Sequence, residues 1–293
     1  MQITFWGVRG SIPSPGPKTV RYGGNTTCIS LETDDGQFII LDAGTGIFAL
    51  SQTLLKRLPL NCSIFLTHTH WDHIQGLPFF VPFFIPNNKI HIFGALDPVS
   101  GKSIEDVLSG QMDYCYFPVR QNELVAEITY TTLKEKQIIE LGKTKITSIL
   151  MNHPGLNFGY KIECGGRIIF FTGDNEPLYN IYSPEDDAYQ LNENLIAEKK
   201  AMLADFICGA DVLIADSTYT EAEYSLKKGW GHGTFDSSIA MAKDAGAKRL
   251  FFTHHEPLRT DDDLDAIQSR IIEQHGEGDT LFTIAFEGLE VLL

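Results

Sequence analysis

Short apolar runs recur along this chain, and polar or glycine-rich segments separate them. Runs of roughly four to eight apolar residues are typical of buried β-strands, whereas apolar residues that return every three or four positions predict helices. The predicted strands are 3–6, 28–32, 38–42, 62–66, 89–93, 137–141, 145–150, 158–164, 168–171, 211–215 and 249–253, with further strands at the carboxyl end. The predicted helices are 47–57, a short helix after Ser103, 192–207, 234–245 and 261–274.

The order of these elements predicts the architecture. Strands joined by glycine-containing turns fill the middle of the chain, which favours a mainly antiparallel or mixed sheet. Two strand-rich stretches that each end in helices predict an α/β fold, with two sheets face to face and helices outside. A length of 293 residues and a hydrophobic content of 43% suit such a core. Because no linker or repeat interrupts the pattern, we expect a single domain over residues 1–293.

Charge and composition narrow the functional classes. The net charge of −15 disfavours a sequence-independent grip on nucleic acid phosphates. Bound divalent metals would offset this charge locally, so a small anionic substrate stays open. The five cysteines are scattered and form no C-x-x-C pair, which fits reduced thiols in the cytoplasm. The amino terminus has the pattern of a strand rather than of a signal peptide, and no stretch approaches the ~18 apolar residues of a membrane span.

The segment that directly follows strand 62–66 carries the strongest chemical signal. Residues 68–73 contain three of the nine histidines of the chain together with one aspartate. On an extended loop His68 and His70 point to the same side and can share one metal, and Asp72 and His73 follow at a turn. Imidazole and carboxylate suit zinc and other first-row divalent metals. A solvated loop that happens to be rich in histidine does not account for this clustering.

Four further ligand-type residues each follow the end of a predicted strand: His153, Asp174, Asp216 and His254. The α/β folds place catalytic groups at such ends because the rigid strand positions them. Any one of these residues alone would be a turn former or a helix cap. Together with the histidine-rich segment, they predict one site. His255 is the alternative to His254, and the register from strand to loop favours His254.

These residues divide into two metal positions that share one bridging carboxylate. The predicted ligands are His68, His70 and His153 for one metal, Asp72, His73 and His254 for the other, and Asp174 for both. Two metals about 3.5–4 Å apart can activate a bridging water and clamp the oxygens of a displacement. Three imidazoles on one metal leave an open position, which is typical of a catalytic site. The expected cofactors are two divalent ions, zinc first, with manganese or iron as alternatives.

The motif T-H-T-H-W-D-H at 67–73, followed by separated His, Asp and His, resembles the metallo-β-lactamase superfamily of hydrolases. Asp42 in the segment 41–46 matches an early Asp-Gly motif of that superfamily. The resemblance spans residues 5–254, implies an αββα four-layer sandwich, and agrees with the ligand assignments position by position. Asp174 stands where true zinc β-lactamases have cysteine. We expect Asp42 to hydrogen-bond a ligand histidine or the adjacent loop.

The segments 216–219, 229–234 and 253–254 look like the phosphodiesterase branch, which includes tRNase Z and cyclic phosphodiesterases. By that resemblance, His232 protonates the leaving oxygen and Asp216 orients His232, with Asp72 also among the catalytic residues. Histidine is well suited to this acid role near neutral pH. The plainer interpretation makes His232 a turn residue before a helix and Asp216 a turn former.

The predicted function is hydrolysis of a small cyclic nucleotide or related phosphodiester. The alternatives are a tRNase Z-type endoribonuclease, a thioester or lactone hydrolase, and a non-catalytic metal-binding sensor. An acidic insertion at about 175–205 contains seven acids against two lysines. It would repel RNA, and we expect it to form a cap or a homodimer contact. The aromatic run 79–84 is expected in the core or on a dimer surface, with a wall for a planar substrate group as the alternative. His91 and His275 are expected to be structural.

Overall fold

Two seven-stranded sheets make up the centre of the computed structural model, which describes residues 1–276 and 278–293. The first sheet contains β1 (Gln2–Gly7), β2 (Cys28–Glu32), β3 (Phe38–Leu41), β4 (Asn61–Phe65), β5 (Lys89–Ala95), β6 (Glu127–Leu133) and β14 (Glu290–Leu292). The second contains β7 (Ile138–Leu141), β8 (Thr144–Met151), β9 (Asn157–Cys164), β10 (Arg167–Phe171), β11 (Val212–Asp216), β12 (Arg249–Thr253) and β13 (Leu281–Ile284). The spatial orders are β14-β1-β2-β3-β4-β5-β6 and β13-β12-β11-β10-β9-β8-β7.

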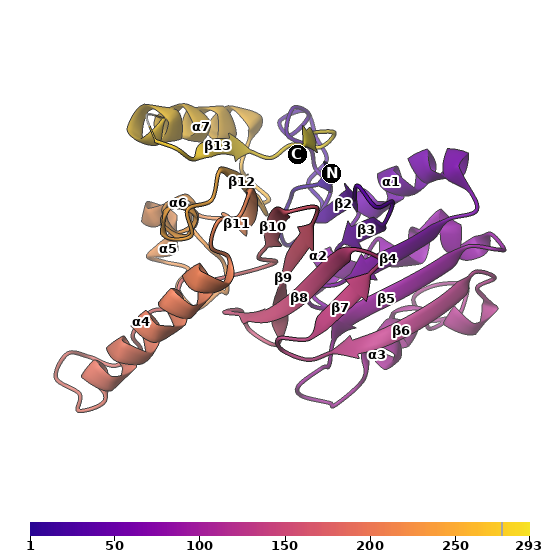
Figure 1. The fold of residues 1–293 in the computed structure, drawn as a ribbon, viewed down its shortest axis with the longest axis horizontal. Coiled ribbons are helices and arrows are strands. Elements are labelled where there is room, and N and C mark those ends of the chain that lie inside the picture. Colours follow the sequence, from indigo (N-terminus) through magenta and orange to yellow (C-terminus); the bar gives the residue numbers. More distant parts are fainter. Residues whose placement is uncertain (277) are drawn as a thin grey trace.

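Helices cover the outer faces of both sheets (Figure 1). The helices are α1 (Gly46–Leu54), α2 (Trp71–Ile74), α3 (Ile104–Gln111), α4 (Tyr189–Phe206), α5 (Glu221–Tyr224), α6 (Phe235–Asp244) and α7 (Asp261–His275). Short 3₁₀ turns occupy Leu55–Arg57, Leu77–Phe79, Val81–Phe84 and Gln121–Glu123. Helices α1 and α3 pack on the first sheet, and α6 and α7 pack on the second. The predicted αββα sandwich is confirmed.

The strand directions decide which loops come together. Strands β3 to β6 are parallel to one another, and so are β10 to β13. Strand β8 has the same direction as β10, because both are antiparallel to β9. The carboxyl ends of β8, β10, β11 and β12 therefore lie at one edge of the second sheet, so the segments that follow these strands emerge side by side.

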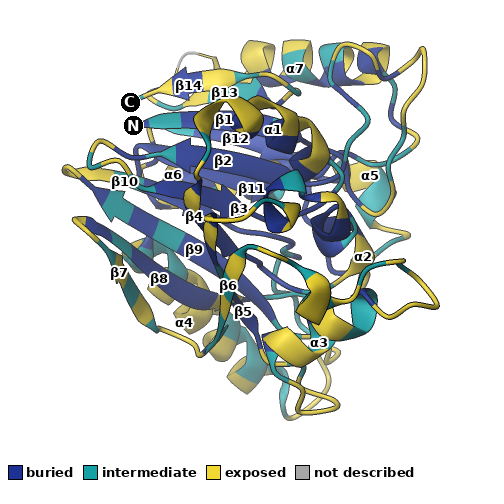
Figure 2. Ribbon diagram, turned by 90° about the vertical axis from the view of Figure 1, so that its right-hand side faces the viewer, coloured by how far each residue is buried: buried dark blue, intermediate teal, exposed yellow. Residues whose placement is uncertain are grey.

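The layer between the two sheets is apolar and closely packed, and Figure 2 shows the central strands as buried. Phe65 stacks on Phe93 with ring centroids 4.4 Å apart, and Tyr160 from the opposite sheet meets Phe65 edge-on at 5.4 Å. The Tyr160 hydroxyl donates a hydrogen bond to the Leu66 carbonyl over 2.5 Å. This bond ties β9 to the residue that follows β4, and so holds the start of the histidine-rich segment against the second sheet.

Helix starts follow the capping rules. Ser103, Thr234 and Thr260 each accept a hydrogen bond from the backbone three residues later, within a capping box.

The sequence analysis did not predict β6, because its residues are mostly half-buried and the hydrophobic signal is weak. It also placed the start of α4 three residues too late, at 192 instead of 189. Boundaries shift readily where frayed ends lack a strong cap.

The aromatic run 79–84 is split between two environments. Phe80 and Phe83 are buried in the core under the first sheet, whereas Phe79 and Phe84 are exposed. A core position is therefore confirmed for Phe80 and Phe83, whereas a dimer surface or a substrate wall stays a prediction for the exposed Phe79 and Phe84. All five cysteines are free, and no helix in the described part of the chain has the length and apolarity that crossing a bilayer requires.

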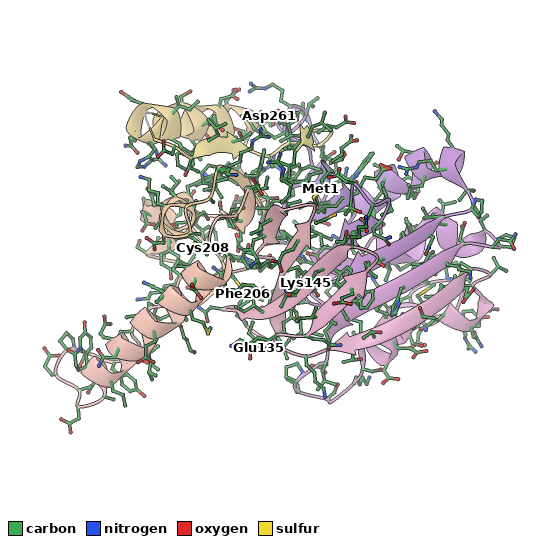
Figure 3. The ribbon with its side chains drawn as sticks, in the orientation of Figure 1. Met1, Glu135, Lys145, Phe206, Cys208 and Asp261 are labelled. Carbon is green, nitrogen blue, oxygen red and sulfur yellow. The ribbon has the colours of Figure 1, made fainter. Side chains whose placement is uncertain are left out.

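Helix α4 stands apart from this packing. Figure 1 shows it projecting away from the sheets, and none of its residues is buried. Only its base, with Leu203 and Phe206, packs against the second sheet, and Figure 3 shows Phe206 at that junction. The side chains on the outer turns of α4 point away from the rest of the molecule (Figure 3). A role of the insertion 175–205 as cap or dimer contact stays a prediction.

The aromatic contact between the sheets should dominate stability. Phe65→Ala should lower the free energy of unfolding by about 3–5 kcal/mol, because it opens a cavity beside Phe93 and Tyr160. Urea denaturation measures the loss. The matched control Phe48→Ala, at a side chain that is 51% exposed, should change stability by no more than about 0.5 kcal/mol. Equal losses in both variants would show that the inter-sheet layer is not the stabilising core.

Candidate metal centre

Segments that leave five strand ends converge at one edge of the molecule. They follow β4, β8, β10, β11 and β12, and they bring together every residue that the sequence analysis placed in the site. The ligand atoms form three groups, and within each group they all lie within 4.8 Å of one another. The groups are His68, His70, His153 and Asp174; Asp72, His73, Asp174 and His254; and Asp174, Asp216, His232 and His254.

Asp174 is common to all three groups and is 2% exposed. Its Oδ1 lies 3.2 Å from Nε2 of both His73 and His254. Its Oδ2 faces the other way, 3.6 Å from His68 Nε2 and 3.8 Å from His153 Nε2. Because each oxygen faces a different set of imidazoles, the carboxylate has the placement that a bridge between two metals requires.

The first group consists of imidazole nitrogens around Asp174 Oδ2. His153 Nε2 lies 3.0 Å from His70 Nδ1, and the rings of His68 and His70 meet edge-on with centroids 4.5 Å apart. His68 Nε2 is buried without a hydrogen-bond partner. Convergent ring nitrogens with no donor between them are typical of a metal position.

The second group adds a carboxylate. Asp72 Oδ2 lies 3.2 Å from His254 Nε2 and 3.4 Å from His73 Nε2. The two Nε2 atoms are themselves 3.4 Å apart. The backbone amide of Ser11 donates to the same Asp72 oxygen over 2.6 Å and so fixes the carboxylate from the amino-terminal loop.

Asp42 orients two of these imidazoles. His73 Nδ1 donates directly to Asp42 Oδ2 over 2.8 Å. His68 Nδ1 lies 3.0 Å from the Thr67 hydroxyl, which in turn donates to Asp42. Such partners fix the tautomer that leaves Nε2 free for a metal. The expectation that Asp42 hydrogen-bonds a histidine of the site is confirmed.

Asp216 repeats this arrangement on the second sheet. His232 Nδ1 donates directly to Asp216 Oδ2 over 3.0 Å. His254 Nδ1 lies 3.0 Å from the Thr218 hydroxyl, which donates to Asp216 Oδ1 over 2.7 Å. One carboxylate therefore orients both the predicted acid and a predicted ligand. The backbone of His254 has φ of 60°, and strained backbone of this kind concentrates at functional sites.

The buried carboxylates of the site show whether its residues fit metal ions. Asp42, Asp72, Asp174 and Asp216 are all buried, and among residues 1–276 and 278–293 each of their ion pairs is to a histidine. Burial lowers the pKa of His73, but the nearby carboxylates, Asp174 foremost, outweigh it and raise that pKa well above its usual value. Asp174 Oδ1 also lacks a hydrogen-bond donor. Buried carboxylates demand a compensating cation, so the residues fit divalent metal ions.

His232 lies against the metal centre rather than within the first two groups. Its ring stacks on His254 with centroids 4.8 Å apart, and its Nδ1 is committed to Asp216, which leaves Nε2 for a substrate. Burial disfavours the imidazolium, but Asp216 outweighs burial and raises the pKa of His232 to about 9. A plain turn residue would not need this buried partner.

Other histidines lie outside the site. His255 Nε2 donates to the Ala285 carbonyl over 2.8 Å, and burial lowers the pKa of His255 to about 3. His91 contacts Thr131 on the first sheet, and His275 ends α7. Sequence reasoning missed the orienting hydroxyls of Thr67 and Thr218. Thr67 lies within the motif 67–73 and Thr218 within the segment 216–219, so their membership of these motifs was the available signal.

Residues 37–255 match the family described as the Beta-lactamase superfamily domain. The match covers more than half of the chain, so the chain belongs to this superfamily. Family membership together with the clustered ligand-type residues defines a metal-dependent hydrolase.

The similar proteins include members of the phosphodiesterase branch. The ribonuclease Z of Thermoplasma volcanium is 26% identical over 291 residues, which cover 89% of each chain. Human tRNase Z, short form, has a TM-score of 0.63 at 21% identity, covering 100% of this chain and 99% of that chain. A diphosphatase from the PhnP family has a TM-score of 0.64 at 18% identity, covering 100% of this chain and 97% of that chain. The predicted resemblance to the phosphodiesterase branch is confirmed.

Asp174→Ala should release bound metal, because the variant removes the one carboxylate of residues 1–276 and 278–293 that faces both imidazole groups. Elemental analysis of the purified, metal-reconstituted variant measures the metal content per chain. Asp186→Ala, in the exposed insertion, is the matched control and should keep the wild-type content. An Asp174→Ala variant that still holds two metals would place the bridge on another residue.

Proposed function

We propose that this protein is a dinuclear metal-dependent phosphodiesterase with His232 as the general acid. The observation that carries the proposal is the placement of the His232–Asp216 pair against the two imidazole groups that share Asp174. A phosphodiester needs an activated water on one side and a protonated leaving group on the other. This edge of the molecule holds residues suited to both tasks.

The donor set supports two divalent ions, and zinc fits it best. His68, His70 and His153 would hold one ion, and Asp72, His73 and His254 the other, with Asp174 between them. Nitrogen-rich sites with a few carboxylate oxygens favour zinc, and manganese or iron are the alternatives. Bound metals would supply activation of a water and neutralisation of charge on the phosphoryl oxygens.

The chain itself supplies the proton for the leaving group. His232 is held by Asp216 through Nδ1, and the carboxylate keeps the imidazole protonated near neutral pH. Departure of an alkoxide is slow without such a proton. A thioester or lactone hydrolase would not need this pair, and a metal sensor would need no acid.

A small phosphodiester, such as a cyclic nucleotide, is the substrate class that we favour. The net charge of −15 and the acidic insertion 175–205 oppose an extended contact with an RNA backbone. The second candidate is tRNA 3′-end processing, because the related sequences and a similar structure are ribonucleases Z. These similarities give no support to the expectation that the charge of the chain disfavours nucleic acid as a partner. A single domain, a homodimer and a cytoplasmic location stay predictions.

His232→Ala should retain both metals and lower turnover of an alkyl phosphodiester by roughly a hundred- to ten-thousand-fold, the usual range for loss of a general acid. The loss should shrink for bis-nitrophenyl phosphate, because nitrophenolate departs without protonation. Steady-state kinetics on the two substrates, with metal analysis of the same samples, measure this. Equal losses for the good and poor leaving groups would contradict the acid role.

Asp216→Asn serves as the companion variant. Because Asp216 raises the pKa of His232, its loss should lower that pKa. The alkaline limb of the rate profile for the alkyl substrate should then move to lower pH, since the protonated imidazole is the active form. The variant should also weaken metal binding by about 10–100-fold, because Asp216 orients His254 through Thr218.

A substrate panel should separate the two candidate functions. Metal-reconstituted protein should cleave cyclic mononucleotides or bis-nitrophenyl phosphate, and the triple variant with Glu185, Asp186 and Asp187 changed to the amides should keep that activity. Gel-shift and cleavage assays with precursor tRNA at physiological salt provide the contrast. Tight binding and 3′ cleavage of precursor tRNA by the wild type would overturn the choice of a small substrate.

A further inference from the structure

Glu176 is a buried carboxylate close to the site, and the phosphodiesterase chemistry proposed above assigns it no task. It stands two residues after Asp174 and is 4% exposed. The Tyr224 hydroxyl and the Gly229 amide donate to its Oε1 over 2.8 and 2.6 Å, and the Gly231 amide donates to its Oε2 over 3.0 Å. One side chain thus binds three donors of the segment 224–231.

Part of this segment lies at the surface, and the buried Glu176 side chain holds it from the interior side. Residues 228–230 are exposed, and the backbone of Gly231 has a φ of 90°, a conformation that residues other than glycine rarely adopt. The Gly231 carbonyl accepts a hydrogen bond from His153 Nδ1 over 2.8 Å. The next residue is His232, so the position of this peptide affects both a predicted ligand and the predicted acid.

The fit around Gly231 leaves little room for movement. A Cβ at this position would lie 2.4 Å from His153 Nδ1 and 2.3 Å from Pro154 Cδ. The backbone therefore packs directly on the His153 ring. A small shift of this peptide would change the orientation of the imidazole, and the Gly231 carbonyl selects the tautomer that leaves Nε2 facing Asp174.

Glu176 also connects to the other side of His153. Its backbone amide donates to the Asn152 carbonyl over 2.8 Å, and Asn152 Nδ2 donates to the Glu176 carbonyl over 3.0 Å. Glu176 consequently links three parts of the site by hydrogen bonds: the residue before His153, the segment after Asp174 and the segment that carries His232.

We propose that Glu176 is a positioning residue that clamps the peptide at 229–231, and through it sets both the His153 ring and His232. The part that concerns His232 rests on the proposed function. The part that concerns His153 depends only on the metal site. A merely structural carboxylate would affect global stability alone, whereas a clamp controls the local order of the segment and the affinity for metal.

Glu176→Gln tests the clamp with little change in volume. The amide has a single acceptor oxygen, so its NH₂ group must face one of the three donors, and one hydrogen bond is lost. Loss of a hydrogen bond to a charged group on a weakly held segment should raise the population of the open segment about tenfold or more. Lys227 and Lys228 lie within this segment and provide trypsin sites.

The first readout uses metal-free protein. Under native conditions, trypsin should cleave Glu176→Gln after Lys227 or Lys228 at least about ten times faster than it cleaves the wild type. Glu185→Gln is the matched control, because it makes the same change of charge at an exposed acid of the neighbouring insertion. Tyr224→Phe removes only the phenol bond and should give a smaller increase.

The second readout is metal affinity and leaving-group dependence. Glu176→Gln should weaken metal binding by about 10–100-fold, measured by competition with a chelating dye. At saturating metal, turnover of an alkyl phosphodiester should fall more than turnover of bis-nitrophenyl phosphate. Glu185→Gln should match the wild type in both measurements.

The outcomes separate the clamp from the proposed function. If Glu176→Gln equals Glu185→Gln in trypsin cleavage and in metal affinity, the clamp is overturned, whatever the activity. If the wild type cleaves no phosphodiester but trypsin cleavage and metal affinity still change, the proposed function fails and the clamp stands. If Glu176→Gln does not fold, a Tyr224→Phe variant that is indistinguishable from the wild type in trypsin cleavage overturns the clamp.

Discussion

The compensation of buried negative charge is the constraint on which this structure depends. Asp174 lies at the centre of the molecule's chemistry, 2% exposed, with one oxygen toward His73 and His254 and the other toward His68 and His153. A carboxylate in such a place is costly without cations. The surrounding side chains are histidines, whose neutral imidazole nitrogens can bind divalent ions. The same interaction therefore explains why the residues cluster and what they are suited to bind.

The topology produces this cluster through the directions of a few strands. Strands β8, β10, β11 and β12 all end at one edge of the second sheet, and the segment after β4 comes from the first sheet. The hydrogen bond from Tyr160 to the Leu66 carbonyl holds the two contributions together. The apolar layer between the sheets thus has a second role beyond stability, because it sets the distance between ligands from different sheets.

The same arrangement of one carboxylate and one threonine hydroxyl orients a pair of imidazoles at two places in the site. Asp42 holds His73 directly and a second histidine through a threonine hydroxyl, and Asp216 does the same for His232 and His254. Each sheet supplies one of these carboxylates. The predicted acid shares its carboxylate with a predicted ligand, so acid strength and metal geometry are coupled. Glu176 extends this support to the peptide before His232, where no regular element does so.

Much of the site could be predicted from the sequence because the chemistry is local there. Alternating histidines after an apolar strand, and single ligand-type residues at later strand ends, indicated the candidate ligands that the fold brings together. The hydrophobic pattern indicated most strands and the layered fold, but missed the half-buried β6. Only the tertiary structure decided that Thr67, Thr218 and Glu176 take part, since each also needs a partner distant in the chain: Asp42 for Thr67, His254 for Thr218, and the segment 224–231 for Glu176. For His254 over His255 the strand-to-loop register in the sequence already indicated the choice, and the structure adds its physical basis: His254 has a φ of 60°, and the His255 backbone is hydrogen-bonded to the amino-terminal loop at Val8 and Gly10.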